Sequence, residues 1–302
     1  MSEKWVVVMG SFVADLAFRT PQLPAWGQTI MGSAFQLGPG GKGSNQAVAA
    51  ARLGAKVSFI SKLGRDPFGD LARETYKKEK IDTQFLFDTE HATGAASIVV
   101  HEAKGENAIV VVPGACFKMT IADVDRAKPL IERAAIFMTQ LELPLDVVEH
   151  GLALAHHAGV PTILNPAPAF ELPRSIYPLC DYFTPNESEA GAANFEDAKR
   201  AADDFLARGV RNVVITLGAQ GALVKNRQLM KHVPAFDAGP VVETTGAGDA
   251  FNGGFAVALS EGRNVVDAAR YGCATAGISV TRLGTAPSMP SRAEVDALVG
   301  RS

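Results

Sequence analysis

The feature that most constrains the fold of this chain is a regular alternation between short apolar runs and amphipathic segments. The apolar runs are rich in β-branched residues, which is typical of strands buried on both faces of a parallel sheet. They include WVVV from Trp5, KVSFIS from Lys56, AAIFM from Ala134, PTIL from Pro161, YFT from Tyr182 and NVVIT from Asn212.

Helical patterns separate these runs, and they include residues 44–53, 68–79, 121–133, 145–157 and 195–208. Strand and helix in alternation predict right-handed crossovers and an α/β, doubly wound, mainly parallel sheet with helices on both faces. A chain of 302 residues that is 47% apolar could form one large domain or two smaller ones. Because no repeat, low-complexity tract or linker separates two halves, we predict one domain over residues 1–302.

Two regions interrupt the alternation, within about residues 12–37 and 95–112. The first contains Pro21, Pro24 and several glycines, and in the second SIVVHEAKGENAIVVV indicates a hairpin that turns at residues 104–107. Neither has a helix to cover its second face. We expect them to form a small antiparallel β lid over a cleft, which could also serve as a dimer contact. The alternative is an extra hairpin on the main sheet.

Composition excludes several classes of partner. The net charge is −3 with acids and bases interspersed, so the chain has no basic stripe for nucleic acid and no polybasic segment for a membrane. No apolar run is long enough to span a bilayer, and MSEKWVVVMG lacks the pattern of a signal peptide. Cys116, Cys180 and Cys273 show neither a disulfide framework nor zinc-ligand spacing. We expect a cytoplasmic protein.

A glycine-rich segment, GPGGKG, occupies residues 38–43 and formally matches a dinucleotide-binding fingerprint. The half-polar GSAFQL before it is not a buried strand, so an NAD-dependent oxidoreductase is only a distant alternative. A Walker A loop fails because Gly43 stands where Ser or Thr should bind magnesium. Glycines would let a polar ligand approach the backbone, with Lys42 and Asn45 as donors at a helix start. A flexible turn with a solvated lysine is the other interpretation.

A second glycine-rich segment, ETTGAGDAFNGGF at residues 243–255, runs from an extended stretch into a helix. The backbone N–H groups of Gly246, Ala247 and Gly248 would form an anion cradle at the helix N-terminus. Asp249 would repel an anion there, but it suits a general base that deprotonates a hydroxyl beside a transferring phosphoryl group. An acid that only serves the helix dipole is the alternative.

A third segment, VVITLGAQGAL at residues 213–223, turns back tightly after a buried strand. The turn at residues 216–221 is a place where the phosphates or ribose of a nucleotide could lie against the main chain. A plain β-turn is the competing interpretation.

Taken together, these segments resemble the ribokinase family of carbohydrate kinases over essentially the whole chain. GGKGSNQAVAAARLG at residues 40–54 and TTGAGDAFNGGF at 244–255 are similar to the two signatures of that family. The remaining motifs occur in the order of the family: KLGRDPFG at 62–69, NPAPA at 165–169, TPNESEA at 184–190, TLGAQG at 216–221 and VTRLGTAPSMP at 280–290.

The resemblance implies a fold, an activity and a set of site residues. The activity is ATP-dependent phosphorylation of the primary 5-hydroxyl of a pentose, D-ribose first, with Asp249 as general base and residues 246–248 as the anion hole. It also implies Mg²⁺ with ATP as phosphoryl donor, K⁺ as a further cofactor and a homodimer formed through the lid. The implied sugar pocket contains Asp15, Gly41, Lys42, Asn45, Glu142 and Asp249.

The same resemblance implies where ATP and the metal ions bind. Asn186 and Glu189 match the N-x-x-E element of the family and would position magnesium and the phosphates. Cys273 would lie near the adenine, although a plain buried helix position is the alternative. The implied nucleotide contacts are Asn186, Thr216, Gly218, Gly221, Gly248 and Cys273, and the implied monovalent-cation site contains Glu243, Thr245, Ser279, Arg282, Gly284 and Ser288.

 Magnesium keeps much of its water shell when it binds, so the side-chain oxygens of Asn186 and Glu189 would hold it through water.

Three positions depart from the family pattern. Val13 stands where the family carries a sugar-binding Asn, and a ligand hydroxyl left without its partner costs about 1 to 3 kcal/mol. This departure favours a sugar lacking one hydroxyl, such as 2-deoxyribose, and other sugar or nucleoside kinases are further alternatives. Glu243 replaces an aspartate of the cation site, and Cys116 replaces an Asn after the lid hairpin. A non-catalytic sugar-binding protein would have no need for Asp249 beside an anion hole.

Overall fold

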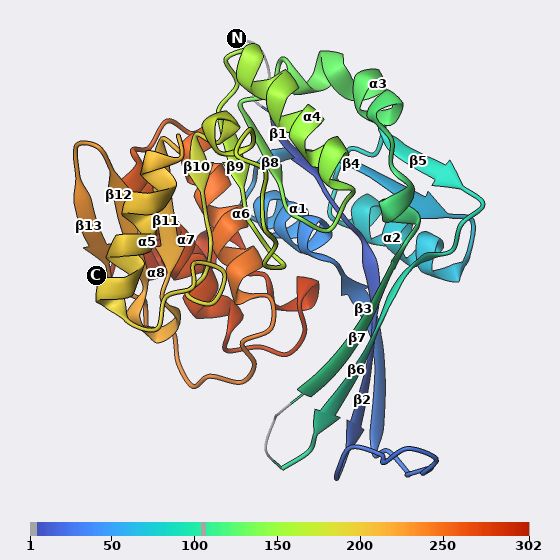
Figure 1. Ribbon diagram of the computed structural model, residues 1–302. Helices are drawn as coiled ribbons and strands as arrows, with labels where there is room; N and C mark the ends of the chain where they lie inside the picture. Colours follow the sequence, from blue (N-terminus) through green and yellow to red (C-terminus); the bar gives the residue numbers. More distant parts are fainter. Residues whose placement is uncertain (1–4, 104–106, 302) are drawn as a thin grey trace.

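Two β-sheets organise the molecule, and the computed structural model describes them through residues 5–103 and 107–301 (Figure 1). The main sheet has nine strands in the order β13-β12-β11-β10-β9-β8-β1-β4-β5. Pairing is parallel from β5 to β11 and antiparallel at β12 and β13. Its strands are β1 Trp5–Met9, β4 Lys56–Gly64, β5 Leu86–Thr89, β8 Ile136–Thr139, β9 Thr162–Leu164, β10 Tyr182–Phe183, β11 Asn212–Thr216, β12 Ala222–Asn226 and β13 Met230–Val233.

Helices cover both faces of the main sheet, as predicted. Alternate residues of β1 enter different cores: Val6 and Val8 pack with α1, α2, α6, α7 and α8, whereas Val7 and Met9 pack with α3, α4 and α5. This alternation follows from the two-residue period of a strand. The helices are α1 Lys42–Arg52, α2 Pro67–Lys78, α3 Ile121–Ile131, α4 Leu145–His157, α5 Phe195–Ala207, α6 Ala247–Ser260, α7 Val265–Ser279 and α8 Arg292–Val299.

The start of each helix follows from its local sequence. Asp66, Thr120, Asn194 and Asn264 accept backbone N–H groups at the first turns of α2, α3, α5 and α7. In contrast, α1 and α6 begin at glycines with positive φ and have no capping side chain on the N-cap residue. The N-terminal amides of α1 and α6 are therefore available to other groups.

The small sheet consists of β2 Val13–Thr20, β3 Ala34–Gly40, β6 Thr93–His101 and β7 Asn107–Gly114, and it extends away from the main sheet (Figure 1). The prediction of a separate small sheet is confirmed. Its outer pairs, β2–β3 and β6–β7, are antiparallel, while the central pair β2–β6 is parallel. Most of the predicted hairpin turn, residues 104–106, lies outside the described residues.

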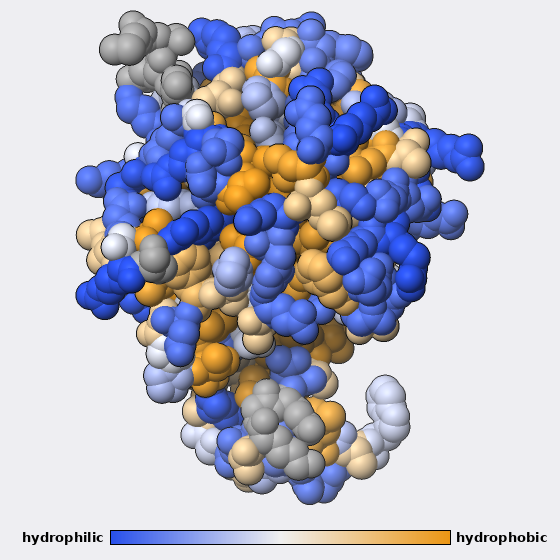
Figure 2. Space-filling view, turned by 90° about the vertical axis from the view of Figure 1, so that its left-hand side faces the viewer, coloured by the Kyte–Doolittle hydropathy of each residue, from blue (hydrophilic) through white to orange (hydrophobic). Residues whose placement is uncertain are grey.

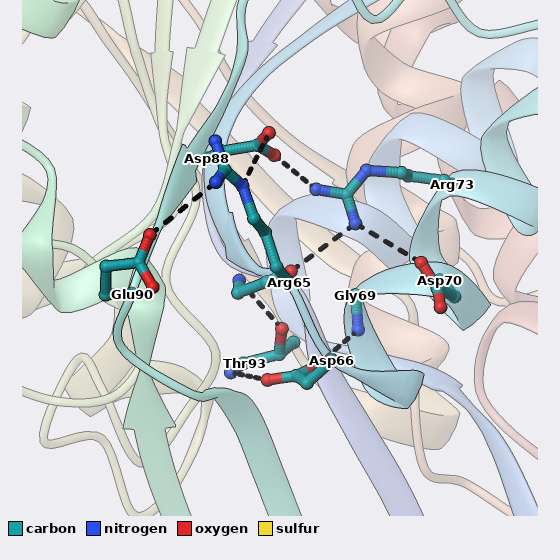
Figure 3. Close-up of polar contacts among 9 residues, drawn as sticks. Arg65, Asp66, Gly69, Asp70, Arg73, Asp88, Glu90 and Thr93 are labelled. Carbon is teal, nitrogen blue, oxygen red and sulfur yellow. Dashed lines mark hydrogen bonds and ion pairs between the residues drawn. The ribbon is translucent and has the colours of Figure 1, made fainter.

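A network of polar contacts connects the small sheet to the main sheet (Figure 3). The carboxylate of Asp66 accepts the N–H groups of Gly69 at 2.8 Å and Thr93 at 2.7 Å, and Thr93 Oγ1 accepts the N–H of Gly64 at 2.9 Å. Arg65 and Arg73 pair with Asp88 on the neighbouring strand. These contacts join the end of β4, the start of α2 and the first residue of β6.

The helices within the described part of the chain include none long and apolar enough to cross a membrane.

Candidate active site

The carboxylate of Asp249 lies where the first turns of α1 and α6 meet. Asp249 is 6% exposed, and its two oxygens accept different side-chain amides. Oδ2 accepts Asn45 Nδ2 at 2.9 Å, and Oδ1 accepts Gln46 Nε2 at 3.0 Å. The predicted base is thus fixed by two residues of the GGKGSNQ motif, which stands about two hundred residues earlier in the sequence.

Burial and charge act in opposite directions at this carboxylate. Burial raises the pKa of Asp249, while the ammonium of Lys42 and the amides of Asn45 and Gln46 favour its ionised form. Lys42 is itself buried, but the negative charges of Asp249, Glu142 and Glu189 outweigh that burial and raise its pKa. The site therefore pairs one buried cation with several carboxylates, and this cation favours the ionised form of Asp249, which can accept a proton.

Glu142 completes the beginning of α1. Its Oε2 accepts the backbone N–H of Lys42 at 2.9 Å and also the hydroxyl of Ser11. A carboxylate from the loop after β8 therefore supplies the cap that Gly41 lacks. Three of the residues predicted for the sugar pocket, Gly41, Lys42 and Glu142, lie together for this reason.

Asn45 has spare hydrogen-bonding capacity. While its Nδ2 donates to Asp249, its buried Oδ1 has no hydrogen-bond partner among the described residues. An unpaired buried acceptor is costly unless a ligand donor reaches it. A sugar hydroxyl next to Asp249 would satisfy this oxygen.

Asp15 projects from β2 of the small sheet and meets the C-terminal segment. Its Oδ2 accepts the hydroxyl of Thr285 at 3.0 Å, and the same hydroxyl lies 3.1 Å from the carbonyl oxygen of Pro39. Burial raises the pKa of Asp15 to about 6, against the bond from Thr285 and together with the nearby charges of Glu142, Asp249 and Glu243. Asp15 therefore belongs to the same electrostatic cluster as the predicted base.

The glycines of GPGGKG are explained mainly by contacts within the chain. A Cβ on Gly40 would lie 2.2 Å from Asp15 Oδ2, and a Cβ on Gly43 would lie 2.6 Å from the Cα of Gly10. Gly41 has φ +88°, and its Cβ would lie 2.8 Å from the backbone nitrogen of Val13. The segment thus needs glycine so that α1 can approach β2 and the loop after β1.

A cavity of about 820 Å³ opens on the other side of α6. It is large enough for a nucleotide, and Ala247 and Gly248 form its wall nearest to Asp249. Nothing would lie within 4 Å of a Cβ on Gly248, so its backbone is open to a ligand. The structure brings to this cavity every predicted nucleotide contact: Asn186, Thr216, Gly218, Gly221, Gly248 and Cys273.

The turn before α6 only partly matches the predicted anion hole. The N–H of Ala247 donates to the carbonyl of Thr244 at 3.1 Å, because residues 244–247 form a turn that leads into the helix. The N–H groups of Gly246 and Gly248 have no partner in the described part of the chain. Two of the three amides are therefore available, and Gly246 reaches its position through a φ of +82°.

Asn186 and Glu189 hold each other through reciprocal backbone contacts. Asn186 N donates to Glu189 Oε2 and Glu189 N donates to Asn186 Oδ1, both at 2.8 Å. A bridge between Asn186 and Thr216 places this turn at the cavity of about 820 Å³, which both residues line. Burial raises the pKa of Glu189, while its bond from Asn186 and the charge of Lys42 oppose that rise. Carboxylate and amide oxygens are ligands that suit Mg²⁺.

The predicted monovalent-cation residues divide into two groups. Glu243, Thr245 and Gly284 line a smaller cavity of about 160 Å³ that also contains Asp15. Glu243 Oε2 accepts the N–H of Gly284 at 2.8 Å, so the side chain ties the two segments together. The other three residues do not line this cavity: the hydroxyls of Ser279 and Ser288 donate to backbone carbonyls, and the guanidinium of Arg282 pairs with Glu294.

Val13 and Cys116, the two other departures, are both buried. Val13 shares the face of β2 that carries Asp15, because the two residues are separated by one position. It therefore lies on the same side of the sheet as Asp15, which is predicted to belong to the sugar pocket. The thiol of Cys116 donates to the carbonyl of Pro113 at 2.8 Å, where the small sheet rejoins the body, and burial raises its pKa to about 12.

Sequence reasoning missed several polar residues of the site. Gln46 donates a hydrogen bond to Asp249 directly, and Asn165 is connected to Asp249 through Gln46. The hydroxyl of Thr285 donates to Asp15. Gln46 and Asn165 lie within motifs whose other residues attracted attention, GGKGSNQ and NPAPA. Their signal was a polar side chain directly before a run of small apolar residues: AVAAA follows Gln46, and PAPA follows Asn165.

Comparisons with known proteins show the family to which the chain belongs. The model of the pfkB family carbohydrate kinases matches residues 3–292. A ribokinase of Haemophilus influenzae is 40% identical over 298 residues, covering 96% of this chain and 97% of the relative. A deoxyribokinase of Salmonella typhi is 35% identical over 293 residues, covering 95% of each. The structure of Arabidopsis thaliana ribokinase complexed with ribose and ATP matches with a TM-score of 0.92 at 30% identity, covering 100% of both chains.

Proposed function

Because the chain belongs to the pfkB family of carbohydrate kinases and is an ATP-dependent pentose kinase, we propose that it phosphorylates the primary 5-hydroxyl of D-ribose. We infer that Asp249 is the general base and that residues 1–302 act as one catalytic unit. A 2-deoxyribose kinase is the second candidate, and Val13 is the observation that favours it.

One observation carries this proposal: Asp249 separates two sites of the right chemistry. On one side lie Asn45, Lys42 and Asp15, with hydrogen-bonding groups for sugar hydroxyls. On the other side lies the nucleotide-sized cavity, whose wall includes Gly248. A hydroxyl that donates to Asp249 would face the phosphoryl group bound in that cavity.

The mechanism follows from this arrangement. Asp249 accepts the proton of the sugar hydroxyl, while the amides of Gly246 and Gly248 and the ammonium of Lys42 stabilise the negative charge of the transferring group. Alignment of the two substrates supplies a large part of the barrier reduction, up to about 7 to 11 kcal/mol. The small sheet, acting as a lid, would exclude water and so prevent hydrolysis of ATP.

The oxygen donors present fit the two metal ions that the family implies. Asn186 and Glu189 would hold Mg²⁺, which neutralises phosphate charge when bound. Glu243, Thr245 and Gly284 supply oxygens for K⁺ beside Asp15. The Glu243 carboxylate already bridges to Gly284, so the longer side chain keeps the two segments of this site joined.

Activity toward a panel of acceptors tests the proposed function. We expect ATP-dependent phosphorylation of ribose and 2-deoxyribose with kcat/KM well above that for fructose or adenosine. NMR of the product should place phosphate on the 5-oxygen. Phosphate at the anomeric oxygen, or a preference for adenosine, would contradict the proposal.

Val13→Asn tests whether the side chain at position 13 of β2, two residues before Asp15, contacts the sugar. The substitution adds an amide on the sugar-facing side of β2, and we expect the kcat/KM ratio of ribose to 2-deoxyribose to rise by about tenfold. Val99→Asn, on the opposite face of the same sheet, is the matched control and should leave the ratio unchanged. An equal change in both variants would mean that Val13 does not contact the sugar.

Replacing Na⁺ with K⁺ tests the monovalent-cation site. If Glu243 keeps the site intact, K⁺ should raise kcat of the wild-type protein, and Glu243→Asp should retain this activation. Equal rates in NaCl and KCl at matched ionic strength would argue against a functional site.

We further propose that the small sheet joins two copies of the chain into a homodimer. In the space-filling view this sheet projects below the body and carries apolar side chains among polar ones (Figure 2). Its face opposite Asp15 exposes a group of large apolar residues, which is unusual for a surface without a partner. They are Phe18, Phe35, Leu37, Val110 and Val112.

A further inference from the structure

Gln46 lies at the centre of a buried group of side-chain amides beside Asp249. Its side chain is fully buried, and its Nε2 donates both to Asp249 Oδ1 at 3.0 Å and to Asn165 Oδ1 at 3.1 Å. Its Oε1 accepts Gln140 Nε2 at 2.7 Å. All the hydrogen-bonding groups of this amide are therefore engaged, and one of them contacts the predicted base.

The bonds continue from Asn165 and return to α6. Asn165 Nδ2 donates to the backbone carbonyl of Thr184 at 2.8 Å, and the hydroxyl of Thr184 donates to Asn252 Oδ1 at 2.7 Å. Asn252 Nδ2 then donates to the carbonyl of Gly248 at 2.8 Å. This series of hydrogen bonds thus begins at the Asp249 carboxylate and ends at the backbone carbonyl of Gly248, the residue before Asp249.

The direction of these bonds is fixed at Thr184. A backbone carbonyl can only accept, so Asn165 must turn its amide nitrogen toward Thr184 and its oxygen toward Gln46. Gln46 must in turn present its nitrogen to Asn165 and to Asp249. The network therefore offers Asp249 a donor and not an acceptor, which favours the ionised carboxylate over the protonated one.

Stability alone does not account for this group. Buried amides are costly unless every polar atom is paired, and Gln140 Oε1 is buried without a hydrogen-bond partner among the described residues. Gln140 is also packed so closely that a Cβ on Gly10 would lie 2.3 Å from that oxygen. An apolar core at this place would avoid the unpaired atom.

We propose that Gln46 is a positioning residue for phosphoryl transfer: held by Asn165 and Gln140, it orients the Asp249 carboxylate and keeps it ready to accept a proton. This inference rests on the proposed role of Asp249 as base. It assigns a catalytic consequence to Gln46, which would bind neither sugar nor nucleotide directly.

The test is the pH dependence of kcat/KM in Gln46→Met, a variant of similar length that has no donor. Loss of a hydrogen bond to a charged group should move the acidic limb of the profile upward by about one to two pH units. kcat at neutral pH should fall by roughly tenfold. KM for the sugar should change little, because Lys42, Asn45 and Glu142 are untouched.

Asn212→Leu is the matched control. Asn212 is another buried amide, bonded to the carbonyl of Asp181 and to Asn226, but it lies at the start of β11, away from α1 and α6. Its loss should lower Tm and leave the acidic limb unchanged. If Gln46→Met does not fold, Gln140→Met carries the test, with a smaller shift in the same direction.

Three results separate the possible failures. An unchanged acidic limb in Gln46→Met and Gln140→Met would overturn the role of Gln46, even if Asp249→Asn is inactive. A shift of equal size in Asn212→Leu would also overturn it, since the effect would then follow from lost stability. Near-normal kcat in Asp249→Asn would instead overturn the proposed base.

Discussion

At the scale of single residues, the site brings together several carboxylates whose negative charges are only partly balanced by a nearby cation. Asp15, Glu142, Glu243 and Asp249 act on one another through space, and Lys42 is the cation that faces them. Such an arrangement disfavours folding but suits a site that must accept a proton and bind sugar hydroxyls. The stability of the molecule and its activity should therefore respond in opposite directions to changes here.

Asp15→Asn tests this opposition. The folded-state pKa of Asp15, about 6, exceeds the ordinary value of 3.8, so its ionised form destabilises the fold above pH 6 and this cost disappears below about pH 4. Asp15→Asn should raise Tm at pH 8, leave it nearly unchanged at pH 4, and raise the sugar KM. A Tm difference that is the same at both pH values would contradict the account.

At the scale of elements, the connection between the two sheets depends on Asp66. Although burial alone would raise its pKa, the N–H donors of Thr93 and Gly69 outweigh burial and hold the pKa of Asp66 below its usual range. The carboxylate thereby links α2 to the first residue of β6 (Figure 3). The motif KLGRDPFG thus has a structural role at the root of the small sheet.

Asp66→Ala should destabilise the protein by about 1 kcal/mol, as the loss of a helix cap does. Because the pKa is lowered on folding, the stabilisation is present above pH 4 and is lost as pH falls further. Denaturant unfolding at pH 7 and pH 3 measures both effects. Asp70→Ala, in the same helical turn but 74% exposed at its side chain, is the control and should change little.

Sequence patterns predicted the elements better than their pairing. The apolar runs at Trp5, Lys56 and Asn212 became strands of the main sheet, and residues 145–157 became α4 with the predicted bounds. The parallel pairing of β2 with β6 could not be foreseen, because it joins segments separated by β3, α1, β4, α2 and β5. Local patterns carry no information about such distant partners.

The parts of the candidate site that could be predicted are those in which neighbouring residues of one sequence motif lie together on a single turn. The residues around Gly218 and Gly248 that we predict to contact the nucleotide line one cavity, because each turn follows or precedes a regular element. The series of hydrogen bonds through Gln46, Asn165 and Asn252 was not predictable, because it depends on which side chains three separate elements direct toward each other. Burial of these amides appears only in three dimensions.

At the scale of the whole molecule, the small sheet is predicted to serve two purposes. One face carries Asp15 toward the proposed sugar site, and the opposite face exposes apolar side chains. If two copies pair through that opposite face, each sugar site is held by a sheet that the dimer keeps in place. Activity and assembly would then be linked through the same element.

Val110→Glu tests the proposed dimer, because Val110 is 69% exposed on the apolar face. A charge there should convert a dimer into a monomer in sedimentation velocity runs, with an increase in the sugar KM. Met230→Glu, 50% exposed on β13 of the main sheet, is the control and should leave the mass unchanged. A wild-type protein that sediments as a monomer would contradict the proposal.

The central claim is that Asp249 removes the proton from the attacking hydroxyl, and a single-turnover measurement on Asp249→Asn tests it most directly. With ATP and ribose bound, the variant should transfer phosphate at least about a hundredfold more slowly than wild type. Its affinity for ATP should be nearly unchanged, and Asp267→Asn, at the exposed first turn of α7, should react normally. Transfer by Asp249→Asn at close to the wild-type rate would contradict the claim.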